Sequence, residues 1–440
     1  MRLFVLLALL CVTIPVRAQD HPAIGQLRAL LGDGVSLEFA RSTPLPGPGE
    51  GVTLHEVVIT NAGNRDTIAT LSLRGLRANG VENLVARDVV THSAEGDLRV
   101  GQITLTGLVA YRRTDGTDQQ PDDVKLRELV VEDITIPGRP AIAIGRVSLN
   151  AYGLGQMSRG EVSDIAVTNI PDSPFDGVSI GRLNIAGINL AGLASDAVAL
   201  RAPGQQATGR PSLSLNNLTL RGGGEVLAAL ADLSIEGQIN DQGSGEGSVT
   251  LRGLTAEPTA ISAPFLAMLG LERLNAGLTL QGSYDAASGR LVVPAFSLDV
   301  GGVAALTLGL TLDGLTAEAA QAQDANGLRL ADARLRLADQ SLYRRALQAL
   351  AREQGGDARA VREQHAQIVA GMLTSARPEP AMVALREVLQ RFIRGEINVV
   401  ELQAKPAAPV VLMGLAAAAA QGPAGIIRQL GLSARGERRP

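Results

Sequence analysis

The sequence predicts a mainly β protein, with a long curved antiparallel sheet of repeated hairpins followed by a C-terminal α+β element. Two observations favour this fold class. Between residue 52 and about residue 315, short runs alternate apolar with polar residues and are bounded by Gly, Asn, Asp and Pro, which is typical of half-buried strands. From residue 339 onward the apolar residues recur instead at helical spacing.

The alternating runs predict a sheet with one apolar and one polar face. A weak repeat, Leu-x-Gly-Leu, lies at the ends of several runs, where a glycine fits a bulge or a bend of the sheet. Because the spacing of the repeat is irregular, a hairpin unit of variable length is favoured over a solenoid of fixed period. The glycines of the repeat and its one variant are Gly75, Gly107, Gly253, Gly314 and, in the variant, Gly187.

Residues 1–18 are predicted to be a cleavable secretory signal peptide, which places the protein in the periplasm. Arg2 precedes an apolar run over residues 3–14, and Val16 and Ala18 fit the small-residue rule for cleavage. The run is shorter than the roughly 20 residues that span a bilayer, so a retained anchor is the alternative. Cys11 is the only cysteine. Cleavage would therefore leave a mature chain without disulfides, thiolate metal sites or cysteine nucleophiles.

Four segments are expected. Residues 1–18 form the signal peptide, 19–51 a short helix and strand with a Pro/Gly-rich linker, 52–325 a β-rich body, and 326–440 a helical element bracketed by strands.

Finer elements are expected within these segments. Short helices should interrupt the body near residues 225–231 and 264–269. In the last segment, Asp339 and Asp357 are expected to cap two helices, and Pro378 and Pro380 to introduce a third. An alanine-rich helix is expected over 410–420, and a final turn and strand near 426–434.

Composition argues against two ligand classes. Aromatic residues make up 2% of the chain and tryptophan is absent. Carbohydrate platforms and single-stranded nucleic-acid sites usually stack their ligands on aromatic rings, so neither ligand is expected.

The charge is uneven along the chain. Residues 326–440 carry 17 Lys or Arg against 10 Asp or Glu, and the rest carries 23 against 34. The basic C-terminal part suggests peripheral contact with an anionic membrane, and an ordinary solvated helical surface is the alternative.

No motif predicts catalysis, a metal site or a cofactor. The histidines, His21, His55, His92 and His365, have no metal-binding spacing, and His365 is expected to be a solvated helix residue. The glycines at 222–224 lack the Gly-Lys-Ser/Thr ending of a phosphate loop and predict a loose strand-helix connection. Pairs of acidic residues could serve acid-base chemistry, but no pattern brings them into a cleft; they are Asp122 with Asp123, Glu132 with Asp133, and Glu318 near Asp324.

The C-terminal quarter resembles the ends of exported Gram-negative envelope proteins of the broad YdgA or AsmA-like type. The resemblance rests on the segment that starts at Asp339 with Gln-Ser-Leu-Tyr-Arg-Arg-Ala, on Arg-Glu-Gln at residues 352–354 and 362–364, and on the turn that starts at Lys405 with Pro-Ala-Ala-Pro. It implies a periplasmic location and a role at the cell envelope, in some AsmA-like relatives in lipid movement. It carries no catalytic residue.

The expected function is that of a non-enzymatic envelope protein which binds or transfers lipid through an apolar sheet face. A long sheet with one apolar face must cover that face or curl around it, and an open apolar groove would suit an acyl chain. A structural or protein-interaction module with a closed apolar core is the alternative. An enzyme with an unrecognised carboxylate site is the third.

Overall fold

The computed structural model of the chain describes residues 22–31, 35–47, 50–61, 64–92, 96–110, 121–153, 155–198, 209–259, 262–316, 318–319, 326–374, 379–415 and 422–439. The predicted signal peptide, Cys11 and His21 lie outside these ranges. The chain divides into two compact units, residues 1–225 and 226–440.

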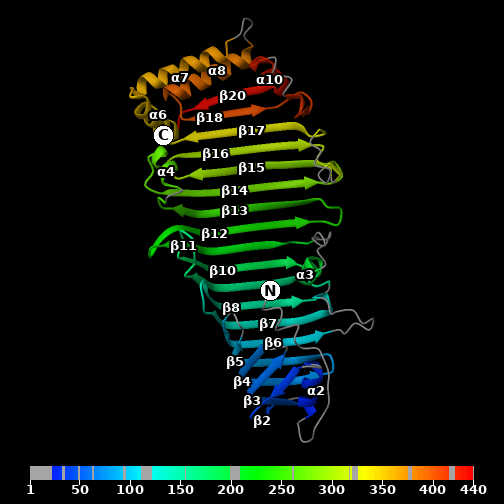
Figure 1. Cartoon of the computed structure of the whole chain (residues 1–440). Helices are drawn as coiled ribbons and strands as arrows, with labels where there is room; N and C mark the ends of the chain where they lie inside the picture. The colour runs from blue at the N-terminus through cyan, green and yellow to red at the C-terminus, as the bar shows by residue number, and fades with distance from the viewer. Residues whose placement is uncertain are drawn as a thin grey trace. The chain divides into compact units, whose positions relative to one another are not determined.

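The described part of the first unit holds eleven strands, two helices and one 3-10 turn. Its elements are coloured from blue to green in Figure 1. The helices are α2 (Pro22–Leu31) and α3 (Leu190–Val198), and the turn is η1 (Pro121–Asp123). The strands are β1 (Val35–Glu38), β2 (Arg41–Pro44), β3 (Gly51–Asn61), β4 (Asn64–Arg77), β5 (Gly80–His92), β6 (Leu98–Ala110), β7 (Val124–Ile136), β8 (Ala141–Tyr152), β9 (Ser158–Thr168), β10 (Gly177–Ile188) and β11 (Ser212–Gly222).

The second unit holds nine strands, the first of which begins at the boundary residue, and the described helices gather mostly in its C-terminal part. The helices are α4 (Ala263–Leu269), α6 (Leu342–Gln354), α7 (Ala358–Met372), α8 (Pro380–Arg394) and α10 (Pro423–Leu430). The strands are β12 (Glu225–Ile239), β13 (Gly245–Ala256), β14 (Leu274–Asp285), β15 (Arg290–Val300), β16 (Ala304–Asp313), β17 (Arg329–Asp339), β18 (Val399–Ala404), β19 (Val410–Val411) and β20 (Leu432–Glu437).

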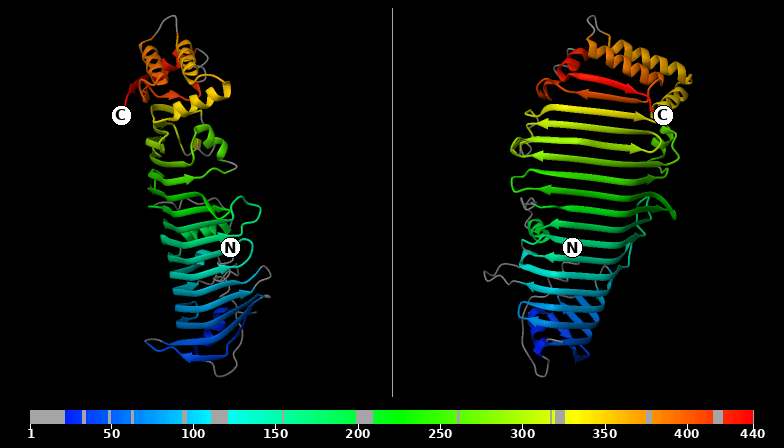
Figure 2. Two further views of the ribbon diagram at one scale, coloured as in Figure 1. Left: turned by 90° about the vertical axis from the view of Figure 1, so that its left-hand side faces the viewer. Right: turned by 180° about the vertical axis from the view of Figure 1, so that it is seen from behind.

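Strand pairing is antiparallel and follows the order of the chain in both units. From β3 to β11 each strand pairs with the next, and β1 and β2 both pair with β3. From β12 to β18 the same rule holds, after which β20 pairs with β18 and the short β19 pairs with the start of β17. Within the first unit, the early strands are turned relative to the later ones (Figure 2). The predicted class, a mainly β protein of repeated antiparallel hairpins with a C-terminal α+β element, is confirmed.

Several expected elements differ from the structure. Residues 225–231 belong to β12 rather than to a helix, and Ala228 and Ala229 pair with β13. The glycines at 222–224 therefore join two strands. The expected helix at 410–420 does not begin at Val410, because Val410 and Val411 pair with β17, and residues 416–420 lie outside the described ranges. Ile426 lies in α10, and the last strand begins only at Leu432. Part of the linker, residues 41–44, forms β2 on the edge of β3.

Other expectations are confirmed. Residues 22–31 form a helix and residues 35–38 a strand, and residues 263–269 form α4. The Asp357 carboxylate caps α7 by accepting a hydrogen bond from the Arg359 amide. The expectation that Asp339 is the cap residue was wrong, because Asp339 ends β17 and Ser341 occupies the cap position of α6. The Asp339 carboxylate nevertheless accepts the Tyr343 amide hydrogen bond in the first turn.

The glycines of the Leu-x-Gly-Leu repeat adopt the left-handed conformation. Their φ angles are 62° at Gly75, 65° at Gly107, 64° at Gly253 and 85° at Gly314, and the variant Gly187 has 70°. Register shifts accompany Gly187 and Gly253. These two positions therefore fit the predicted bulges. Glycine is favoured there because residues with a side chain rarely adopt a positive φ angle.

A second line of left-handed residues crosses the first unit, and the sequence reasoning missed it. Alternate strands carry Glu56, Asp88, Asp133, Asp164 or Asn217, with φ angles from 52° to 56°. The intervening strands β6, β8 and β10 carry glycine opposite these residues, at Gly101, Gly145 and Gly181. In β7, Val131 and Ile134 lie three residues apart and are both buried, so the inward-facing set changes phase at Asp133. We call this line the αL seam.

The αL seam keeps the apolar residues of neighbouring strands on one face. On both sides of Asp133 the register with β6 stays the same, with Ile134 opposite Val100 and Glu132 opposite Gln102. In both strands the alternation of inward and outward side chains therefore shifts by one residue at the same point along the pair, so that apolar residues remain opposite apolar residues.

Candidate functional site: the apolar face of the sheet

In the second unit, aliphatic side chains form unbroken rows across the strands. One row runs from Ile235 through Leu280 and Leu308 to Leu335, each residue opposite another apolar residue on the adjacent strand. A second, parallel row runs from Leu233 to Leu337. In full, the rows are Ile235, Val249, Leu280, Phe296, Leu308, Leu335, Leu402 and Ala434, and Leu233, Leu251, Leu278, Leu298, Leu306, Leu337 and Val400.

These rows are only half-buried from β12 to β17. Ile235 is 39% exposed and Leu335 is 36% exposed, and the row members between them are all of intermediate exposure. A core position of an ordinary domain would be almost completely covered. The apolar face of these strands is thus not covered by other described parts of the second unit to the extent of a closed core.

Helices cover the same face at its C-terminal end. Met382 and Leu385 of α8 and Ile427 of α10 form a buried cluster against Leu402 and Ala434 of β18 and β20. Val388 of α8 packs with Ile397 and Val400 in a neighbouring cluster. The apolar face is therefore capped over β18 and β20 by α8 and α10.

The opposite face of the second unit is polar. The matching row consists of Ser234, Thr250, Thr279, Ser297, Thr307, Arg336, Glu401 and Arg435, each opposite the next. The sheet is thus amphipathic, and water is the natural neighbour of only one of its faces.

The first unit has a comparable row of aliphatic side chains, which is buried in the early strands and partly exposed in the later ones. One row contains Val57, Ile68, Val89, Val100, Ile134, Ile144, Ile165, Ile180 and Leu218, each opposite the next. Its members in β3 to β7 are at most 7% exposed, whereas those in β8 to β11 are half-buried. The change falls between β7 and β8.

Helix α2 helps to close this end of the row. Ala23, Ile24, Leu27 and Leu31 of α2 are buried in one cluster with the side chains of β3 to β8. Ile24 is completely covered. The first strands of this unit therefore enclose a conventional hydrophobic core, and the later strands leave their apolar face partly accessible.

Asp66 is a charged exception on the apolar face. It lies two residues from buried Ile68 on β4, opposite Ile59 of β3 and Thr91 of β5. Its Oδ1 atom and Thr91 Oγ1 are buried and have no hydrogen-bond partner. Burial raises the pKa of the Asp66 carboxyl above its ordinary value of 3.8, and the neighbouring Thr91 hydroxyl, followed by the charge of His92, opposes that rise only in part.

Replacing Asp66 with asparagine is expected to stabilise the first unit at neutral pH by on the order of 1 kcal/mol, because it removes a half-buried charge. An acid with a raised pKa in the folded state destabilises that state fully above the folded pKa and not at all below the unfolded pKa. The gain should therefore shrink as the pH falls through the folded pKa and vanish below 3.8. Urea unfolding of Asp66→Asn and wild type across this range checks it; an equal gain at every pH would contradict the charge argument.

The described histidines and acidic pairs do not assemble into a site. His55 lies 3.3 Å from Thr43 Oγ1, and His92 lies 2.9 Å from Asp97 on the exposed end of β5. Glu132 pairs with Arg146 at 2.8 Å on the polar face, while Asp133 belongs to the αL seam. Asp122 and Asp123 form η1, and Asp324 lies outside the described ranges.

The expectation for His365 was wrong. Its ring is half-buried against Tyr343, and its Nδ1 atom lies 3.2 Å from the Tyr343 hydroxyl. The Tyr343 ring also contacts the ring of Phe392. The contact joins α6, α7 and α8, so His365 is a packing residue. Sequence spacing could not show this because the three helices are separate in the chain.

Two further properties concern the described residues. Among them, no three His, Cys, Asp or Glu side chains are grouped so that they could hold a metal ion. None of the helices within the described ranges combines the length and hydropathy that a membrane-crossing helix needs.

A family model described as an uncharacterized protein matches residues 297–437, from the middle of β15 to the end of β20. That segment contains the C-terminal helices and the strands they cover. No curated protein matches the chain.

Proposed function

We propose that the protein is a non-enzymatic protein of the bacterial periplasm that binds or transfers lipid by holding acyl chains on its apolar sheet face. The observation that carries this proposal is the pair of aliphatic rows from β12 to β17, which are continuous, nearly free of aromatic rings and only half-buried.

Acyl chains fit this surface for chemical reasons. The rows present methyl and methylene groups without charged side chains, so they offer apolar contact without directional hydrogen bonds. Each methylene group removed from water contributes about 0.8 kcal/mol, and a chain lying across several strands would bury many of them. The capped end, under α8 and α10, would limit how far such a chain could extend along the face.

The proposal is tested by comparing lipid that co-purifies with two double variants of the full chain. Leu280→Glu with Leu308→Glu places two charges in the row, and Thr279→Glu with Thr307→Glu places the same charges on the opposite face of the same strands. Mass spectrometry of organic extracts should detect phospholipid with wild type and with the threonine variant, and about tenfold less with the leucine variant. A clean wild-type extract, or equal lipid in both variants, would reject the proposal.

A structural or protein-interaction module is the second candidate, and the closed core between α2 and β3 to β7 favours it. If this candidate holds, wild-type protein should carry no lipid and should recover a stoichiometric protein partner from envelope fractions. The two candidates therefore predict opposite results in the same purification.

A further inference from the structure

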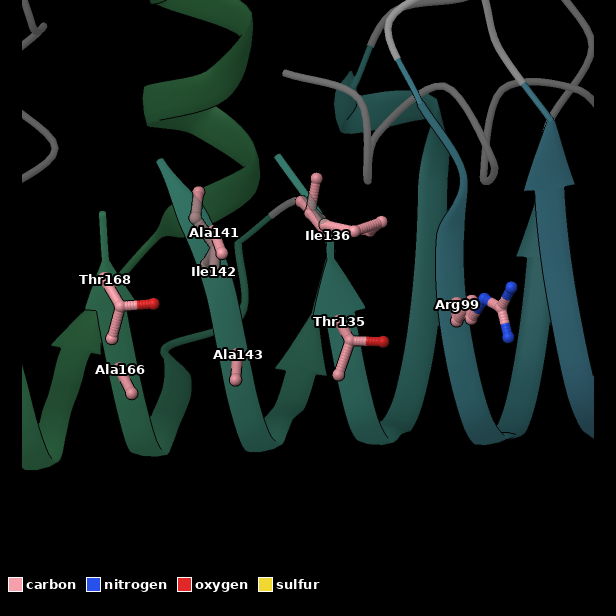
Figure 3. Close-up of a pocket in the computed structure, with 9 residues that line it drawn as sticks. Arg99, Thr135, Ile136, Ala141, Ile142, Ala143, Ala166 and Thr168 are labelled. Atoms are coloured by element: carbon pink, nitrogen blue, oxygen red, sulfur yellow. The ribbon is translucent and has the colours of Figure 1, made fainter. Parts of the chain in front are cut away.

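A hollow of about 370 Å³ lies in the first unit, at the end of the sheet where β6 and β8 begin and β7 and β9 end. Figure 3 shows Arg99 at one end of it and Thr168 and Ala166 of β9 at the other, with Thr135 and Ala143 between them. Its volume is at the lower end of the range of pockets that hold small molecules, about 300–1,000 Å³.

The hollow exists because one stretch of the polar face is built from small side chains. Arg99, Thr135, Ala143 and Ala166 follow one another across the four strands, and Ala141 lies opposite Thr168 in the next row. Towards the middle of the same face, Glu132 and Arg146 are long and ion-paired. The small residues therefore form a floor that lies lower than its surroundings.

The lining combines one positive charge with apolar surface. The Arg99 guanidinium is exposed and, among the described residues, has no ion-pair partner. The hydroxyl groups of Thr135 and Thr168 can donate hydrogen bonds, and the described residues that line the hollow include no acidic side chain. The rest of the lining is aliphatic, including Ile136 and Ile142. An arginine beside hydroxyl donors is suited to a carboxylate.

We propose that this hollow binds a small amphiphile with one carboxylate and a short apolar tail, such as a medium-chain fatty acid. Arg99 binds the carboxylate and the alanine floor contacts the tail. Thr135 and Ala143 lie on the face opposite the aliphatic rows, since they alternate with Ile134 and Ile144 along their strands, whereas Ile136 and Ile142 share the alternation of the row residues and line the hollow at the end of the sheet. The described lining contains no residue of the rows from β12 to β17, so variants of the hollow and of the proposed lipid-binding surface can be made separately.

Ligand-observed NMR titrations of the full chain with octanoate, octanol and acetate test the proposal. Octanoate should bind wild type, octanol should bind at least about fivefold more weakly because it lacks the charge, and acetate should not bind measurably because it lacks the tail. Arg99→Gln should weaken octanoate at least fivefold and leave octanol unchanged. Ala143→Leu should remove binding of both by filling the floor.

Two controls separate this site from the rest of the molecule. Arg159→Gln removes an exposed arginine from the polar face of β9, away from the hollow, and should bind octanoate as wild type does. The Leu280→Glu with Leu308→Glu variant should also retain octanoate. Octanoate affinity that is unchanged in Arg99→Gln or Ala143→Leu overturns the proposal, and loss in the leucine variant would assign octanoate to the apolar face instead.

Discussion

Replacing Leu54 with alanine is expected to lower the free energy of unfolding of the first unit by about 2–5 kcal/mol. Leu54 of β3 is completely covered and lies opposite Leu71, in the cluster that includes α2. Truncation removes buried methyl groups and leaves a cavity, because neighbours on a hydrogen-bonded sheet can move only slightly to fill it.

The matched control is Ile235→Ala in β12 of the second unit. Like Leu54, Ile235 is an aliphatic residue opposite another aliphatic residue on the next strand, but it is 39% exposed. Its truncation should cost less than about 1 kcal/mol, because much of the side chain already contacts water. Urea unfolding of each variant measures the difference. Equal costs at the two positions would mean that the face of the second unit is as closed as the core of the first.

Gly101→Ala has the second largest expected effect, a destabilisation of about 1–3 kcal/mol. A Cβ atom added to Gly101 would lie 2.9 Å from Asp133 Cβ and 3.0 Å from its Oδ2 atom. Asp133 is fixed there by its left-handed backbone at φ 56°, so the aspartate cannot withdraw without changing the αL seam. Thermal unfolding measures the loss.

Two further variants test the cause of this effect. Gly160→Ala in β9 should be nearly neutral, because the nearest atom to its added Cβ, the Ser148 carbonyl oxygen, is 3.9 Å away. Asp133→Gly should restore most of the stability lost by Gly101→Ala, since glycine accepts positive φ and removes the colliding side chain. If the double variant is as unstable as Gly101→Ala, the contact with Asp133 is not the cause.

The strands were largely predictable because their alternation is a local signal. The αL seam was not predicted, since the pairs Val131 with Ile134 and Leu183 with Ile180 lie three residues apart and break the period of two. That spacing, repeated in successive strands beside Asp or Asn and Gly in turn, was the signal that could have revealed the seam. Residues 225–231 were misassigned because Ala and Leu favour helices intrinsically, and pairing with β13 overrides that preference.

Of the two candidate sites, the apolar face could be predicted from the sequence and the hollow could not. An apolar face follows directly from alternation, so the rows were predicted as a class. How far the face is covered depends on where α2, α8 and α10 pack, which no local pattern specifies. The hollow at Arg99 could not be predicted, because its floor comes from single residues of three strands and from the absence of large side chains in their neighbours.

The αL seam also determines how such a chain can change in length. Its left-handed residue returns on every second strand, at Asp88, Asp133 and Asn217 among others, with a strand of the opposite direction between each two. Removing or duplicating a single strand would put two left-handed residues, or none, on adjacent strands. Removing or duplicating a whole hairpin would restore the pattern. In the first unit, the hairpin is therefore the smallest insertion or deletion that keeps the apolar and polar faces of the sheet distinct.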